Sequence, residues 1–174
     1  MLGVVVQDRR RYFRLASPEV AWMLETILVV AAAGPEATRL RATPRVRPEL
    51  RESRTCYDHL AGQLGVAIAD ALLTRGLIEL GDEAGEATEA GRAWLARFGV
   101  SVEPVGKSMR MFCRPCLDWS ERRPHLAGRL GAAPCNRCEE LGWIDRAREG
   151  RIVTVTESSR SGFADAFAYR MSGG

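Results

Sequence analysis

The sequence R-T-C-Y-D-H-L-A-G-Q-L-G at residues 54–65 decides the fold, because it occurs a second time further along the chain. Residues 114–118 read R-P-C-L-D, and after an insert residues 125–131 read H-L-A-G-R-L-G. The alignment then continues without a gap as far as Gly76-Leu77-Ile78 in the first copy and Gly142-Trp143-Ile144 in the second. Self-similarity of this kind is typical of a duplicated unit whose copies pack around one core.

Both copies predict the same order of elements, in which a helix ends at the glycine and two strands and a closing helix follow. In the first copy, apolar residues at helical spacing predict one buried face: Leu60, Leu64, Ala67, Ile68, Ala71 and Leu72. The strands are predicted at residues 77–80, 86–88, 143–147 and 151–156, and the closing helices at 89–98 and 157–169. We therefore predict an α+β, mainly helical fold that is winged-helix-like and contains two repeated helix–β-hairpin–helix units.

Two residues of the second copy bear on where its helices begin and end. Pro134 stands where the first copy has Ile68. Because proline has no amide hydrogen to donate, we expect it to kink or restart the helix. Thr156 precedes the last predicted helix, and its hydroxyl can accept a bond from a free amide of the first turn, so we predict it as the N-cap.

A hairpin and a helix are predicted before the duplicated part. Residues 3–15 place valines and aromatic residues on either side of the basic turn Asp8-Arg9-Arg10-Arg11, which predicts a hairpin with a positively charged tip. Ser17-Pro18-Glu19 is typical of a helix start, and Gly34-Pro35 of a helix end. We therefore predict a hairpin and helix at residues 1–33, a linker at 34–47 and the duplicated domain at 48–174.

The composition favours a globular protein that does not enter a membrane. The 174 residues carry a formal net charge of +3, and 46% of them are hydrophobic, which is too many for a disordered chain. The longest apolar stretch, residues 20–33, contains Glu25 and is too short to span a bilayer, and no secretory signal is evident. We therefore expect a cytoplasmic protein whose five cysteines stay reduced.

Four of these cysteines have a spacing found in zinc sites. Cys113 and Cys116 form one C-x2-C pair, and Cys135 and Cys138 form another. The second pair occupies positions that hold alanine and leucine in the first copy, where a cysteine serves as a small apolar residue of a helix. Only Cys116 has a cysteine counterpart, which is Cys56. The duplication therefore favours core packing over a four-cysteine zinc site.

The repeated Arg, Cys, Asp and His are the other candidate site. Cys56 and His59 would share one face of a helix and could bind a metal ion together. Cys116 and His125 are further apart because of the insert. In the interpretation that we favour, Arg pairs with Asp, Cys fills the core and His bonds a neighbouring carbonyl. No arrangement of nucleophile and base is evident, so we predict neither a cofactor nor enzymatic activity.

Three segments and a short fourth one resemble the C-terminal portion of ArsR-like winged-helix transcriptional regulators: GVVVQDRRRYFRLASPEVAWMLE (3–25), RTCYDHLAGQLGVAIADAL (54–72), RPCLDWSERRPHLAGRLGAA (114–133) and GWI (142–144). The resemblance implies a DNA-binding regulator whose wing contacts phosphate. The matching positions are Arg9, Arg10, Arg11 and Tyr12. It also implies that the helix at residues 18–33 contributes to a homodimer.

In that family the recognition helix comes before the wing, whereas this sequence starts at or just inside the wing. The resemblance therefore implies a truncated regulator that binds DNA weakly and without reading bases. The family's metal-sensing cysteines lie in the recognition helix, so none of them can be carried over. The alternative is a zinc-binding or ligand-sensing interaction module that does not bind DNA.

Overall fold

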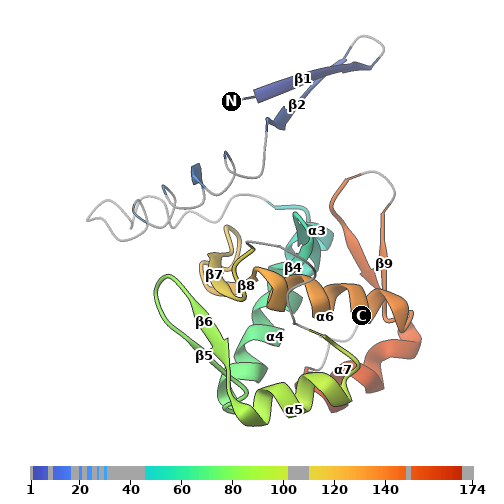
Figure 1. Cartoon of the computed structure of the whole chain (residues 1–174). Coiled ribbons are helices and arrows are strands. Elements are labelled where there is room, and N and C mark those ends of the chain that lie inside the picture. The colour runs from blue at the N-terminus through green and yellow to red at the C-terminus, as the bar shows by residue number, and fades with distance from the viewer. Residues whose placement is uncertain are drawn as a thin grey trace. The chain divides into compact units, whose positions relative to one another are not determined.

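The computed structural model describes residues 2–7, 10–16, 20, 23–24, 27, 30, 46–101, 110–147 and 150–169. The chain divides into two units, residues 1–43 and residues 44–174 (Figure 1). Within the described ranges, no helix is both long and apolar enough to cross a membrane.

The first unit contains the predicted hairpin. Strand β1 (Leu2–Gln7) pairs antiparallel with β2 (Arg10–Leu15), and Gln7 lies opposite Arg10. Residues 20, 23, 24, 27 and 30 are helical, as predicted for them. The other residues of the predicted helix, Arg9 and most of the predicted linker lie outside the described residues.

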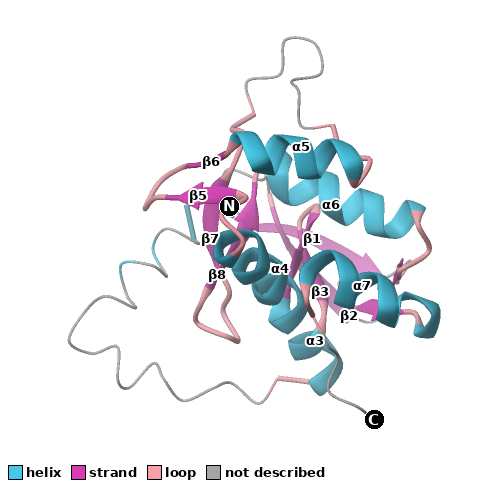
Figure 2. Cartoon of the chain, turned by 90° about the horizontal axis from the view of Figure 1, so that it is seen from below, coloured by secondary structure: helices cyan, strands magenta, loops and turns pink. Residues whose placement is uncertain are grey.

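The second unit consists of two segments with the same order of elements. In each, a hairpin leads into a long helix, and a second hairpin and a closing helix follow. After a short helix, α3 (Pro48–Glu52), the first segment comprises β3 (Arg54–Cys56), β4 (His59–Ala61), α4 (Gly62–Thr74), β5 (Ile78–Leu80), β6 (Gly85–Ala87) and α5 (Glu89–Arg97). The second comprises β7 (Arg114–Leu117), β8 (Pro124–Ala127), α6 (Arg129–Glu140), β9 (Ile144–Arg146), β10 (Val153–Val155), the 3-10 turn η1 (Glu157–Ser159) and α7 (Arg160–Phe167). Helices make up most of this regular structure, which agrees with an α+β, mainly helical fold (Figure 2).

The hairpin that opens each segment corrects the prediction for the repeated motif. Cys56 and His59 do not share a helix face, because they lie opposite one another in the β3–β4 ladder. Cys116 and His125 lie opposite one another in the β7–β8 ladder in the same way. The first hairpin turns at Tyr57, whose φ of 58° is unusual for a residue other than glycine, asparagine or aspartate. The motif therefore forms β-hairpins, and the long helices begin only after it.

The two long helices pack against each other's hairpins. Helix α4 contacts β8, and α6 contacts β4. A Cβ on Gly65 would lie 2.4 Å from the carbonyl oxygen of Leu60, and one on Gly131 would lie 2.2 Å from that of Leu126. The same Cβ on Gly131 would lie 3.1 Å from the Cβ of His59. Glycine in the first turn of each helix therefore lets the hairpins approach closely.

The predicted apolar face enters the core. Of its members, Leu60, Leu64, Ile68 and Leu72 are buried, and Ala67 and Ala71 are half-buried. Leu60 belongs to β4 rather than to the helix. Phe163 and Phe167 of α7 close the core, and their rings contact those of Trp143 and Trp94 respectively.

The prediction that Pro134 restarts its helix is wrong, since α6 runs through it from Arg129 to Glu140. Pro134 is buried and borders a small internal space together with Ile68 and Leu126. Packing against the other segment therefore keeps the helix continuous, although proline removes one of its backbone hydrogen bonds.

Replacing Thr88 with alanine is expected to cost about 1 kcal/mol of unfolding free energy, because Thr88 caps α5. Its hydroxyl accepts a bond from the amide of Gly91 at 3.0 Å and donates one to the carbonyl of Gly76 at 2.8 Å. Thr156 is the matched control, and the structure corrects the prediction for it: it precedes η1, but its hydroxyl donates to the Gly142 carbonyl at 2.8 Å and does not cap an amide. Urea denaturation should show a smaller loss for Thr156→Ala, and equal losses would contradict the capping role.

Candidate functional site

The repeated cysteines and histidines meet where the two opening hairpins lie against each other. The side chains are Cys56 and His59 from β3–β4, and Cys116 and His125 from β7–β8. Each offers one ligand atom, and these four atoms all lie within 4.8 Å of one another. The structure therefore forms one four-residue cluster from residues that the sequence places in two separate pairs.

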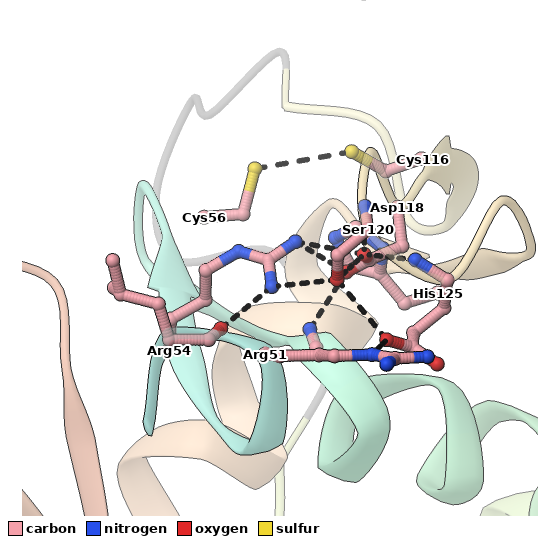
Figure 3. A network of polar contacts seen from close by, with 10 residues as sticks. Arg51, Arg54, Cys56, Cys116, Asp118, Ser120 and His125 are labelled. Atoms are coloured by element: carbon pink, nitrogen blue, oxygen red, sulfur yellow. Dashed lines mark hydrogen bonds and ion pairs between the residues drawn. The ribbon is translucent and has the colours of Figure 1, made fainter. Parts of the chain in front are cut away.

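The cluster is almost sealed from solvent. His59, Cys116 and His125 are 2%, 2% and 1% exposed, and Cys56 is half-buried. The two sulfurs are 4.0 Å apart, and the centroids of the two imidazole rings are 5.1 Å apart. The close approach of the sulfurs is drawn in Figure 3.

The surroundings favour a thiolate at Cys56. The contact with the Cys116 thiol has the largest effect and lowers the pKa of Cys56; burial opposes this shift, and the nearby imidazoles of His125 and His59 add to it. Burial likewise disfavours a charged His59. The Asp58 carboxylate and the Cys56 sulfur overcome that penalty and raise the pKa of His59.

A carboxylate stands behind each histidine. Oδ1 of Asp58 lies 3.4 Å from Nδ1 of His59, and Oδ2 of Asp118 lies 3.8 Å from Nδ1 of His125. Among the described residues, Nε2 of His59 and both ring nitrogens of His125 have no partner at hydrogen-bonding geometry. Buried polar nitrogens without partners are uncommon in folded proteins and call for an explanation.

Asp118 also anchors the buried ion pair that joins the two segments. Its carboxylate accepts bonds from Nη2 of Arg54 at 2.7 and 2.8 Å, and Arg54 and Asp118 are 1% and 0% exposed (Figure 3). The backbone amides of Gly62, Ser120 and Glu121 and the hydroxyl of Ser120 also donate to it. These donors hold the pKa of Asp118 well below its usual range against the effect of burial.

The predicted pairing of Arg with Asp therefore occurs between the two segments for Arg54 and Asp118. Asp58 pairs instead with Arg110, whose Nη2 lies 2.9 Å from Oδ1, and the sequence had not singled out Arg110. Both members of that second pair are about two-fifths exposed, at 43% and 41% of the side chain. The two aspartates thus occupy very different environments although their sequence contexts match.

The remaining cysteines lie apart from the cluster. Cys135 and Cys138 are in α6, as predicted from the duplication, and both are buried with Cys113. Burial raises the pKa of Cys113 and Cys138 to about 12, and that of Cys135 to about 11. Cys116 is therefore grouped with Cys56 and not with the cysteines that share its C-x2-C spacing pattern.

Comparison with known proteins identifies a relative across nearly the whole chain. No family model and no solved structure matches this chain. A curated protein of Bacillus subtilis (strain 168), the uncharacterized HTH-type transcriptional regulator YdfF, is 36% identical over 164 residues. The match covers 94% of this chain and 71% of that protein. Identity at this level and over this length shows that the chain belongs to the HTH-type transcriptional regulators.

Proposed function

We propose that this chain is a DNA-binding transcriptional regulator of the ArsR-like winged-helix type. The observation that carries the proposal is the 36% identity to an HTH-type regulator along 94% of the chain. In this proposal the β1–β2 hairpin contacts the phosphate backbone of DNA, which positions the protein without reading bases.

The β1–β2 hairpin is the proposed wing. Arg10 and Arg11 begin β2, and Gln7 at the end of β1 lies opposite Arg10. The sequence predicts Arg9 in the connecting turn, and Arg9 lies outside the described residues. Guanidinium groups suit phosphate oxygens, and Tyr12 adds a hydroxyl. We assign these four residues to the DNA contact.

The helix of the first unit is the proposed dimer contact. Its described positions are apolar and follow a helical stripe, and four of them are clearly exposed: Met23 40%, Leu24 38%, Ile27 54% and Val30 68%. An apolar face of this kind in one chain favours pairing with a second copy. The proposed regulator is therefore a homodimer.

Replacing Arg9, Arg10 and Arg11 together with alanine is expected to weaken binding to random-sequence duplex DNA and to flatten its salt dependence. Three lost phosphate contacts correspond to a decrease of about 2–3 in the slope of log K against log salt concentration. Fluorescence anisotropy over a range of salt concentrations measures this slope.

The matched control replaces three arginines that are exposed in the second unit, Arg97, Arg151 and Arg160. It removes the same net charge and should leave the slope nearly unchanged. A wild-type chain that ignores DNA at low salt, or equal effects in both triple variants, would favour the interaction module that does not bind DNA.

A further inference from the structure

We infer that Cys56, His59, Cys116 and His125 form a binding site for a zinc-class divalent cation, which joins the two segments of the second unit. The inference concerns the chemistry of residues 46–169 and does not depend on the DNA-binding proposal. It rests on distances, burial and the environment of each donor.

The distances fit tetrahedral coordination. Zinc–sulfur bonds of about 2.3 Å at tetrahedral angles place two sulfurs about 3.8 Å apart. The sulfurs of Cys56 and Cys116 are 4.0 Å apart. All four ligand atoms lie within 4.8 Å of one another, so that small side-chain movements bring them to bonding distance of a shared ion.

The ladder register explains why each hairpin supplies one sulfur and one nitrogen. Cys56 and His59 are directly opposite in the first hairpin, and Cys116 and His125 are directly opposite in the second. Side chains of directly opposite residues project from the same face of a hairpin. Two hairpins that meet through these faces therefore present two thiols and two imidazoles to one point.

The imidazole environments also favour a metal ligand. The Nδ1 side of each ring faces an aspartate, Asp58 for His59 and Asp118 for His125. This carboxylate–histidine arrangement is common behind metal-bound histidines, since it fixes the ring and leaves Nε2 to the ion. Nε2 of both rings is buried without a hydrogen-bond partner among the described residues, and a bound cation would satisfy both.

The donor set selects the kind of cation. Two thiolates and two neutral imidazoles in a tetrahedron suit zinc, whereas magnesium and calcium prefer oxygen ligands. Cys113, Cys135 and Cys138 are buried, but they are not among the four side chains whose ligand atoms lie close together in the described part of the chain.

The test measures zinc in the full chain after purification without added metal, and its affinity by chelator competition. We expect one zinc ion per chain in the wild type, and more than about 100-fold weaker binding in Cys56→Ala and Cys116→Ala, since each loses a direct ligand. Cys113→Ala and Cys138→Ala are the matched controls and should keep the wild-type affinity. Zinc that survives the first pair and disappears in the second would overturn the assignment.

A second measurement does not depend on whether the variants fold. The wild-type chain, stripped of metal and titrated with cobalt(II), should give the visible absorption of a tetrahedral complex, and zinc should displace it. The near-ultraviolet charge-transfer band should correspond to two thiolates. Absence of a tetrahedral complex overturns the inference, and so does a band that corresponds to four thiolates. Neither measurement involves DNA, so failure here is distinct from failure of the proposed function.

Discussion

Replacing Asp118 with alanine is expected to lower the free energy of unfolding by about 3–5 kcal/mol, which is the usual cost of breaking a buried ion pair. The variant leaves the guanidinium of Arg54 buried without a carboxylate partner, next to Ser120 Oγ, the Leu50 carbonyl and the ring of Trp119. It also removes the acceptor for the amides of Gly62, Ser120 and Glu121. Urea denaturation followed by circular dichroism measures the loss.

The matched control is Asp58→Ala, because Asp58 stands at the same place in the first segment. Its partner Arg110 and its own carboxylate are both substantially exposed, and exposed pairs contribute at most about 1 kcal/mol. Both variants are compared in the presence of a chelator, so that metal binding does not contribute to the difference. Similar losses in the two variants would show that Asp118 does not hold the segments together.

Replacing Phe163 with alanine is expected to cost about 3–5 kcal/mol, because it leaves a large cavity at the end of the core. Phe163 is 0% exposed, and its ring centroid lies 5.2 Å from that of Trp143 and 6.0 Å from that of Phe167. Together with the contacts of the Phe167 ring to Trp94 and Phe98, the contact of Phe163 with Trp143 attaches α7 to the rest of the unit.

Two control variants show whether the stability loss in Phe163→Ala comes from the buried cavity. Phe163→Leu keeps most of the apolar volume and should lose clearly less stability than the alanine variant. Leu141→Ala also truncates a large apolar side chain to a methyl group, but Leu141 is 37% exposed. This variant should therefore lower the free energy of unfolding by less than about 1 kcal/mol. A loss in Phe163→Ala no larger than that in Leu141→Ala would mean that α7 is not part of the cooperative core.

The sequence predicted the helices and outer hairpins well, because their signals are local. Apolar spacing in the 60–72 stretch identified the face of α4 that enters the core, and Gly76 marked the end of that helix. The strands at 77–80 and 143–147 were placed within one residue of β5 and β9. Such features depend on residues a few positions apart, which pattern analysis can detect.

The opening hairpins were missed because their turns lack the usual signals. A two-residue turn at Tyr57-Asp58 contains no glycine or asparagine, although Tyr57 adopts a positive φ. In the second copy the insert hides the relation between Cys116 and His125. Packing of the two hairpins together, and not local preference, holds these turns in place.

The candidate site could be predicted only in part. All four residues of the cluster are candidates from the sequence, but only as two separate pairs, Cys56 with His59 and Cys116 with His125. The C-x2-C spacing instead groups Cys116 with Cys113. Nothing local indicates that Cys56 meets Cys116 or that Arg54 meets Asp118, because these contacts connect residues about sixty positions apart. Only the three-dimensional arrangement brings them together.

The exchange of contacts between the long helices and the opposite hairpins has a consequence for the integrity of the domain. Helix α4 contacts β8 of the other segment as well as β4 of its own, and α6 contacts β4 as well as β8. A fragment that ends between residues 102 and 109 would keep the β3–β4 hairpin without α6, and α4 without β8. We therefore expect the two halves to depend on each other for stability, and a single half to be less stable than the whole unit.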